Sequence, residues 1–299
     1  MERKLIKQGG GGYTIYLPKK WVDKKKLKAG DIIKVTETDE SLVIGSEVKE
    51  KKDIILEINE ENKHNLRSLL THIYRKGFNK IEIKNITPEL IKEIKRITSD
   101  VLLGFELTQI EKNSCFLENI SEPTDNKYEV ILKKVFMIIK EMQNLNTESK
   151  EIKENEELRN QLDKFILFCR RMLIKEKYEK NITIEWELLT FLTHIGHSYY
   201  YFYKYTQENK VKLNKKNLEL LESLKEYFNL FEDSYYNNNI DSINKINKLK
   251  SKYQFGECIK LLEKSKGKET VALSYTREIF RIIQIGTSPI LSKILERQD

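Results

Sequence analysis

Residues that end helices are scarce in this sequence, and so is cysteine. The 299 residues include 12 glycines and 4 prolines, and nine of these 16 are spread over the residues after the first 45. Their scarcity favours long helices in the rest of the chain.

The three cysteines, Cys115, Cys169 and Cys258, form no CxxC motif and are odd in number. They predict no disulfide framework and fit a reducing cytosol.

Long apolar runs are also missing. No stretch approaches the roughly 20 uncharged apolar residues that span a bilayer, charged residues make up 33% of the chain, and the mean hydropathy is −0.57. The first residues run into a glycine cluster without an apolar h-region, so we expect no signal peptide. We therefore expect a cytoplasmic protein with no membrane insertion. Hydrophobic residues still make up 39% of the chain, which is enough for packed cores.

Motifs of catalysis are absent as well. The sequence has no G-x-S-x-G, no H-E-x-x-H, no Walker loop and no Cys/His dyad at a recognisable spacing. The glycine cluster Gly9–Gly12 precedes an alternating, strand-like segment rather than a helix, so it predicts a hairpin loop and not a phosphate-binding loop. We expect no enzyme, no cofactor and no bound metal.

Positive charge is concentrated at the N-terminal end. The whole chain carries a formal net charge of +8. Residues 1–36 hold ten basic and three acidic residues, so this segment nets +7 and the rest nets +1. A basic segment on a nearly neutral chain indicates an anionic partner for that segment alone.

The first 48 residues, which we call the head, read as short strands around a short helix. We expect strands at 3–8 and 13–17, a helix that begins at Pro18, and a hairpin of 32–37 with 41–45 around Thr38-Asp39-Glu40. Trp21 is expected in a core. A segment of this size buries little surface alone and exposes strand edges. We infer that the head forms an intertwined homodimer.

Residues 52–121, which we call the module, predict a small α/β fold. Strands are expected at 53–58 and 80–84, with Ile81 and Ile83 facing together, and a final strand pair at 104–111 and 115–119. One helix is expected at 62–76, ended by Gly77. A second is expected to be capped by Thr87 and to begin at Pro88.

Residues 126–299, which we call the helical region, predict helices throughout. Six periodic segments lie near 127–147, 150–177, 183–209, 214–237, 240–265 and 269–296. They divide into two sets of three, about 126–210 and 213–299. The third member of each set holds a similar phrase, around Gly196 and Gly286 respectively, which indicates a duplicated three-helix unit. Aromatic clusters at 199–203 and 227–236 indicate burial between helices or at an oligomer interface, and Cys169 is expected to be a small buried hydrophobe.

The order Arg3-Lys4-Leu5, glycine cluster, Tyr13 to Val22 with Leu17-Pro18-Lys19-Lys20, and Leu27-x-x-Gly30-Asp31 resembles the AbrB/SpoVT swapped-hairpin DNA-binding domain. The helical region resembles the PhoU domain pair. Together with the module, whose Tyr74-x-x-Gly77-Phe78 and Gly104-Phe105-Glu106 phrases also fit, the chain resembles the archaeal PhoU-type regulators. The resemblance implies an α+β multidomain fold: a small β-rich swapped-hairpin head, a small α/β linker module and an all-α tail of two three-helix bundles.

The resemblance implies that the head contacts double-stranded DNA through five residues: Arg3, Lys4, Lys7, Lys19 and Lys20. Arg3 is the sole arginine of the head and therefore its one candidate for a bidentate guanine contact, so we expect more backbone attraction than base readout. For Lys24, Lys25 and Lys26, DNA contact and simple solvation both remain open.

PhoU domains carry acidic metal ligands in helical E-x-x-x-D phrases, and this chain departs from that pattern. Thr193 and His197 stand at those positions in the first set, and Ile283 and Thr287 in the second. Asp163 matches the acidic position of another helix, and one carboxylate makes a poor site for a hard metal ion. His194 and His197, three residues apart on a helix, predict a structural or solvent-facing role rather than a soft-metal site.

Two hypotheses follow for the function. The first is a homodimeric transcriptional regulator whose head binds DNA and whose helical region senses a signal or partner; the resemblance implies phosphate uptake or homeostasis as its context. The second is a PhoU-like interaction adaptor that docks on a phosphate transporter or sensor protein, with a head that serves only dimerisation.

Overall fold

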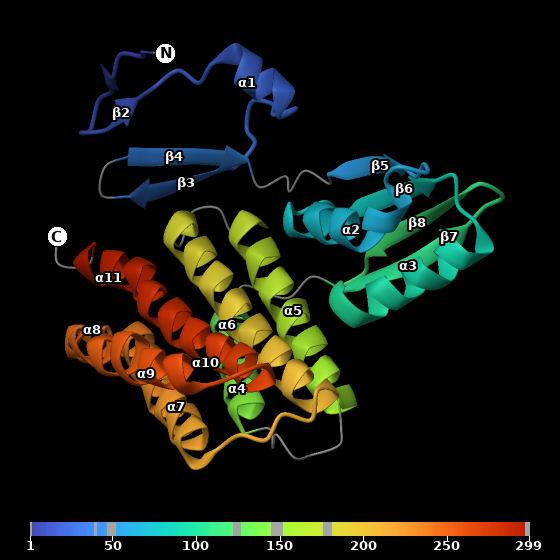
Figure 1. Ribbon diagram of the computed structural model, residues 1–299. Helices are drawn as coiled ribbons and strands as arrows, with labels where there is room; N and C mark the ends of the chain where they lie inside the picture. The colour runs from blue at the N-terminus through green and yellow to red at the C-terminus, as the bar shows by residue number, and fades with distance from the viewer. Residues whose placement is uncertain are drawn as a thin grey trace. The chain divides into compact units, whose positions relative to one another are not determined.

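The computed structural model describes residues 2–38, 41–46, 52–121, 127–144, 152–175 and 181–296. The chain forms two compact units, Met1–Lys51 and Lys52–Asp299. The fold is mixed α+β, as predicted: small β-sheets at the N-terminus, then an α/β module, then an all-helical region (Figure 1). No helix in the described ranges is both long and apolar enough to cross a bilayer.

The head consists of two separate two-stranded antiparallel sheets and one short helix. Strands β1 (Ile6–Lys7) and β2 (Tyr13–Thr14) form the first sheet, and β3 (Ile33–Thr38) and β4 (Ser41–Ser46) form the second. Helix α1 spans Lys19–Lys24 between them. The hairpin prediction for the second sheet is confirmed, although Asp39 and Glu40 of its predicted turn lie outside the described residues.

Two predictions for the head are wrong in detail. The predicted strands at 3–8 and 13–17 pair over two residues each, because the flanking segments have no strand beside them in a single chain. Pro18 is the N-cap of α1, with an extended ψ of 124°, so the helix begins one residue later than predicted. Trp21, expected in a core, is half-buried. No residue in the described part of the head is fully buried.

The module is a four-stranded sheet in the order β5-β6-β8-β7 with helices between its strands. Its strands are β5 (Asp53–Glu57), β6 (Lys80–Lys84), β7 (Phe105–Ile110) and β8 (Ser114–Asn119), and its helices are α2 (Leu66–Arg75), after a 3₁₀ turn at Lys63–Asn65, and α3 (Pro88–Val101). Strands β5 and β6 are parallel, and the other neighbours are antiparallel.

Local signals in the module are confirmed by the structure. The Thr87 hydroxyl accepts a hydrogen bond from the Leu90 amide at 3.3 Å, and Pro88 is the first residue of α3. Gly77 follows α2 with a left-handed φ of +84°, which ends the helix. Ile81 and Ile83 are both fully buried, opposite Leu117 and Cys115 of β8. The predicted helix at 62–76 is α-helical only from Leu66, since the 3₁₀ turn precedes it.

The helical region follows the six predicted segments, two of which are interrupted. The first four are α4 (Lys127–Gln143), α5 (Ile152–Lys175), α6 (Ile182–Glu208) and α7 (Lys215–Tyr236). The fifth divides into α8 (Ile240–Lys252), a π-helical turn (Tyr253–Glu257) and α9 (Cys258–Lys264). The sixth divides at Gly286 into α10 (Lys268–Ile285) and α11 (Thr287–Leu295).

The two glycines of the repeated phrase both lie where segments approach closely. A Cβ atom at Gly196 would lie 2.0 Å from Leu162 Cδ2, so glycine allows α6 to approach α5. A Cβ atom at Gly286 would lie 3.2 Å from both Phe191 and Phe231. The two phrases differ in one respect: helix α6 continues through Gly196, whereas helix α10 ends before Gly286 and α11 begins after it.

The module and the helical region share one hydrophobic core, and α5 joins them. Arg171 of α5 is 3% exposed, and its Nη1 donates hydrogen bonds to the carbonyl oxygens of Tyr74 (2.9 Å) and Phe78 (2.7 Å). Its guanidinium carbon lies 5.0 Å from the ring centroids of Tyr74 and Phe105. On the same helix, Lys164 donates to the Ser99 carbonyl of α3 at 2.9 Å. The charge of Arg171 is thus stabilised by the C-terminal end of α2 and by aromatic faces.

Arg171→Met is expected to destabilise the protein by about 3 kcal/mol, because it leaves the buried carbonyl of Tyr74 and the partly buried carbonyl of Phe78 without their charged donor. Urea unfolding of the full-length protein measures this change. The matched control is Arg96→Met on the exposed side of α3, which should change the free energy of unfolding by less than about 0.5 kcal/mol. Equal effects of the two substitutions would contradict the role of Arg171.

Candidate functional site

The five residues predicted to contact DNA are all exposed. Arg3 and Lys4 precede β1, Lys7 lies in β1 opposite Tyr13, and Lys19 and Lys20 form the first turn of α1. The structure therefore places them in two groups, three on the N-terminal strand segment and two on the helix. Within the described ranges, none of the five forms a salt bridge, so their charges are available to an external anion.

The glycine cluster forms the turn of the first hairpin, as predicted. The Gln8 amide donates to the Gly12 carbonyl at 2.9 Å, and Gly10 and Gly11 have φ values of +90° and +95°. Side-chain-bearing residues rarely adopt such values, so the tight turn requires glycine. The turn fixes the pairing of Lys7 with Tyr13 and thereby the position of one predicted contact residue.

The head also exposes a large set of apolar side chains. In the second sheet, Val35 faces Ile44 across the strands, and Leu42 lies on the same face. Val35 is 53% exposed and Leu42 66%. The other large apolar residues exposed in the described part of the head are Leu5, Ile6, Tyr13, Ile15, Tyr16 and Ile32. Such a concentration of exposed apolar surface on about 45 residues marks an interaction surface.

The structure brings together Asp163 and His197, two of the positions that the sequence analysis compared with E-x-x-x-D phrases. His197 Nε2 lies 2.7 Å from Asp163 Oδ1. The other carboxylate oxygen lies 3.7 Å from Arg67 of α2 and 3.9 Å from Arg159 of α5. Two arginines and a histidine therefore surround the carboxylate, and the cluster adds another link between the module and α5.

The remaining positions of that pattern have local structural roles. The Thr193 hydroxyl donates to the Leu189 carbonyl at 2.7 Å, and the Thr287 hydroxyl donates to the Gln284 carbonyl at 2.7 Å. Ile283 is buried and His194 is exposed. Across the described ranges, no three His, Cys, Asp or Glu side chains converge in a way that could hold a metal ion.

Sequence reasoning missed a buried carboxylate in the first turn of α6. Glu185 of α6 is 5% exposed and accepts hydrogen bonds from the hydroxyl groups of Tyr128 (2.8 Å) and Tyr235 (2.9 Å). Lys293 Nζ of α11 lies 3.6 Å from its other oxygen. Burial, and then the Glu185 charge, raise the pKa of both tyrosine hydroxyls. The carboxylate joins four helices, α4, α6, α7 and α11, and its partners belong to the protein itself.

Most of the predicted aromatic clusters are buried between helices, as expected. Tyr199, Tyr200, Phe202 and Tyr203 are fully buried, whereas Tyr201 is 45% exposed. In the second cluster, the buried residues are Tyr227, Phe228, Phe231 and Tyr235. Rings of α4 and α7 pack together, with centroids 5.7 Å apart for Phe136 and Phe228.

Comparison of the chain with protein-family models, with curated proteins and with solved structures finds no match.

The three cysteines are expected to be unreactive in the folded protein. All three are buried, and burial raises the pKa of Cys115 to about 11 and that of Cys258 to about 12. A thiol with such a pKa holds almost no thiolate at pH 8, and the thiolate is the reactive form. Titration with a thiol-reactive disulfide reagent at pH 8 should label none of the three over minutes and all three after unfolding in guanidinium chloride. Rapid labelling of the native protein would show that at least one thiol is accessible.

Proposed function

We propose that this chain is a DNA-binding transcriptional regulator of the PhoU type, which acts as a homodimer in the cytoplasm and is linked to phosphate uptake or homeostasis. The head contacts double-stranded DNA. The helical region, as two three-helix units, receives a signal or a partner protein. The observation that carries the proposal is the composition of the head surface. Exposed cations and exposed apolar side chains occur there together, and none of the described residues of the head is fully buried.

A second copy of the head is the partner that its apolar surface fits best. Within the described residues of the head, the two sheets share no strand, and each leaves both outer edges unpaired. Exchange of hairpins between two copies would pair these edges and cover residues such as Val35 and Leu42. This swapped-hairpin arrangement accounts for the shortness of β1 and β2 in a single chain.

The charge of such a dimer favours DNA. Two heads that each net +7 over residues 1–36 would bring together about +14. Each lysine or arginine that neutralises a phosphate releases counterions, so affinity would fall steeply with salt. With one arginine per head, backbone contacts and DNA shape would contribute more than base-specific hydrogen bonds.

The packing of the helices supports two three-helix units. Helices α4, α5 and α6 contact one another, and α7, α8 and α10 form a second mutually contacting set. Contacts of α6 with α10 and α11 join the sets. A change in the packing of one set would thus alter the contacts of α5 and of the module that packs against α5.

The double variant Arg3→Ala/Lys7→Ala is expected to weaken duplex binding at least tenfold. A dimer would lose four phosphate contacts, so the slope of log affinity against log salt should decrease by roughly 3 to 4. Fluorescence anisotropy with a labelled duplex at several salt concentrations measures both quantities. Lys92→Ala/Lys95→Ala, on exposed positions of α3, serves as the control of equal charge loss. If the wild-type protein retains no duplex at low salt, the head does not bind DNA.

The double variant Val35→Ser/Leu42→Ser is expected to convert the dimer to a monomer without changing the net charge. Both side chains are largely exposed in the single chain, so their loss should affect association more than the fold of the larger unit. Light scattering coupled to size exclusion measures the mass. Ile110→Ser/Ile120→Ser, two exposed apolar residues of the module, is the matched control. A variant that stays dimeric would place the dimer interface elsewhere.

A further inference from the structure

Seven lysines gather at one end of the helical region, where α6 ends and α7 begins. They lie in two segments, residues 208–216 and 263–269, which are separate in the sequence and adjoin in the structure. We call the surface that these segments form the basic end. Its lysines, all of them exposed, are Lys210, Lys212, Lys215, Lys216, Lys264, Lys266 and Lys268.

Direct contacts hold the two segments of the basic end together. Lys268 Nζ, in the first turn of α10, donates to the carbonyl of Asn209, just beyond α6, at 3.2 Å. Glu269 Oε1 accepts hydrogen bonds from the side-chain amides of Asn214 (2.7 Å) and Asn217 (2.9 Å). The lysines of both segments therefore belong to the same end of the bundle.

The basic end carries a local excess of positive charge. Its two segments hold seven lysines and three glutamates, so they net +4. Residues 37–299 as a whole net +1, so the rest of that range nets −3. Among the described residues, Lys215 is the one lysine of the seven that lies within 4.0 Å of a carboxylate, that of Glu219. Most of this charge is thus available to an external anion.

Two of these lysines oppose the dipole of their own helix. Lys215 and Lys216 occupy the first turn of α7, which holds no acidic residue. The N-terminal end of a helix carries a partial positive charge and favours aspartate or glutamate there. Lysine at these positions therefore lowers the stability of the free protein, and an anionic partner would offset that cost.

The composition of the basic end indicates what kind of anion it fits. Its two segments contain no arginine and no aromatic residue. Protein–protein interfaces are enriched in those residues and depleted in lysine. Binding to a membrane surface uses an exposed apolar face, whereas Val211 and Leu213 pack against the core. Lysine side chains act on phosphate groups as point charges, and DNA carries one such charge for about every 1.7 Å of duplex.

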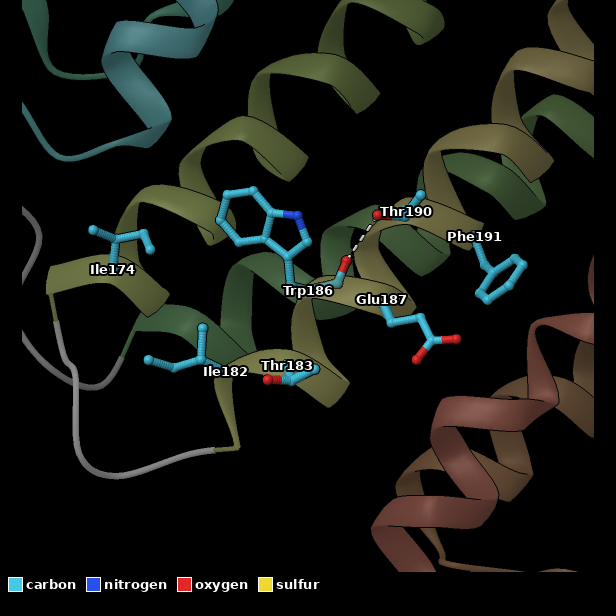
Figure 2. A pocket seen from close by; sticks show the side chains of 7 residues that line it. All are labelled: Ile174, Ile182, Thr183, Trp186, Glu187, Thr190 and Phe191. Carbon is cyan, nitrogen blue, oxygen red and sulfur yellow. Dashed lines mark hydrogen bonds between the residues drawn. The ribbon is translucent and has the colours of Figure 1, made fainter.

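The aromatic and apolar surface of the same helix lies near its other end. Figure 2 shows a pocket of about 620 Å³ at the start of α6, lined by Ile182, Trp186 and Phe191 among others. Helix α6 has 27 residues and is therefore about 40 Å long. The pocket is thus well separated from the basic end, which offers a partner charge and little apolar surface.

We propose that the basic end binds the phosphate backbone of double-stranded DNA, as a second surface in addition to the head. Lysine lacks the planar fork of donors that arginine presents to guanine, so this contact is independent of base sequence. The residues involved are distinct from the five of the head. The proposal therefore does not require that the head itself binds DNA.

Anisotropy of a labelled duplex at low salt tests the basic end in the full-length protein. The contribution of the head is first reduced by Arg3→Ala/Lys7→Ala. In that background, Lys212→Gln/Lys216→Gln/Lys266→Gln should weaken duplex binding at least tenfold. The slope of log affinity against log salt should decrease by at least roughly 2, because three lysines per chain no longer displace counterions.

Two matched variants serve as controls in the same background. Lys92→Gln/Lys95→Gln/Lys112→Gln removes an equal charge from exposed positions of the module and should change affinity less than about twofold. Arginine at the three substituted positions of the basic end keeps the charge and should keep the affinity. Circular dichroism checks that every variant is folded.

Equal losses in the two glutamine variants, or no duplex binding by the Arg3→Ala/Lys7→Ala protein at low salt, would overturn the proposal. Cosedimentation with phosphatidylglycerol vesicles supplies another test. If the basic-end variant loses vesicle binding while its duplex binding is unchanged, the surface contacts membranes and not DNA. Failure of the head to bind DNA gives a different result: Arg3→Ala/Lys7→Ala then leaves duplex affinity unchanged, and the loss in the basic-end variant persists.

Discussion

The buried guanidinium of Arg171 holds the larger unit in one arrangement. It connects α5 to carbonyl groups 97 and 93 residues earlier in the chain, at the end of α2 and just beyond it. The contact with the Tyr74 carbonyl is buried, and a buried acceptor without a donor is costly, so the module and α5 have little freedom to slide past each other. Asp163 and Lys164 of the same helix also contact the module, at Arg67 and Ser99. Arg75 of the module also lies over the ring of Trp186 in α6.

Local signals in the sequence predicted most of the secondary structure. Thr87-Pro88 and Gly77 act through capping and backbone conformation, which need only neighbouring residues. The strands of the head were predicted too long because alternation shows where a strand can form, whereas its length depends on what pairs with it. The π-helical turn at Tyr253–Glu257 had no periodic signature of its own, so the segment at 240–265 was predicted as one helix.

The candidate sites also differ in how far the sequence could predict them. The cations of the head are visible in the composition because they are close in sequence. Neither the contact of Asp163 with His197 nor the grouping of Arg75, Arg170 and Trp186 was predicted. Each of these groupings joins residues of different helices that pack together, so no residue spacing within one segment predicts it. The same holds for Glu185, whose donors come from three other helices.

Helix α5 belongs to two parts of the protein at once. One side of it packs against α4 and α6, and another carries the residues that contact α2 and α3. The module and the helical region are therefore consecutive in the gene but not interchangeable as building blocks. A recombination event between residues 121 and 127 would join a module to an α5 selected for a different surface. Substitutions in α2 and in α5 should consequently be inherited as matched sets, while the head, which forms its own unit, is the part that evolution can replace alone.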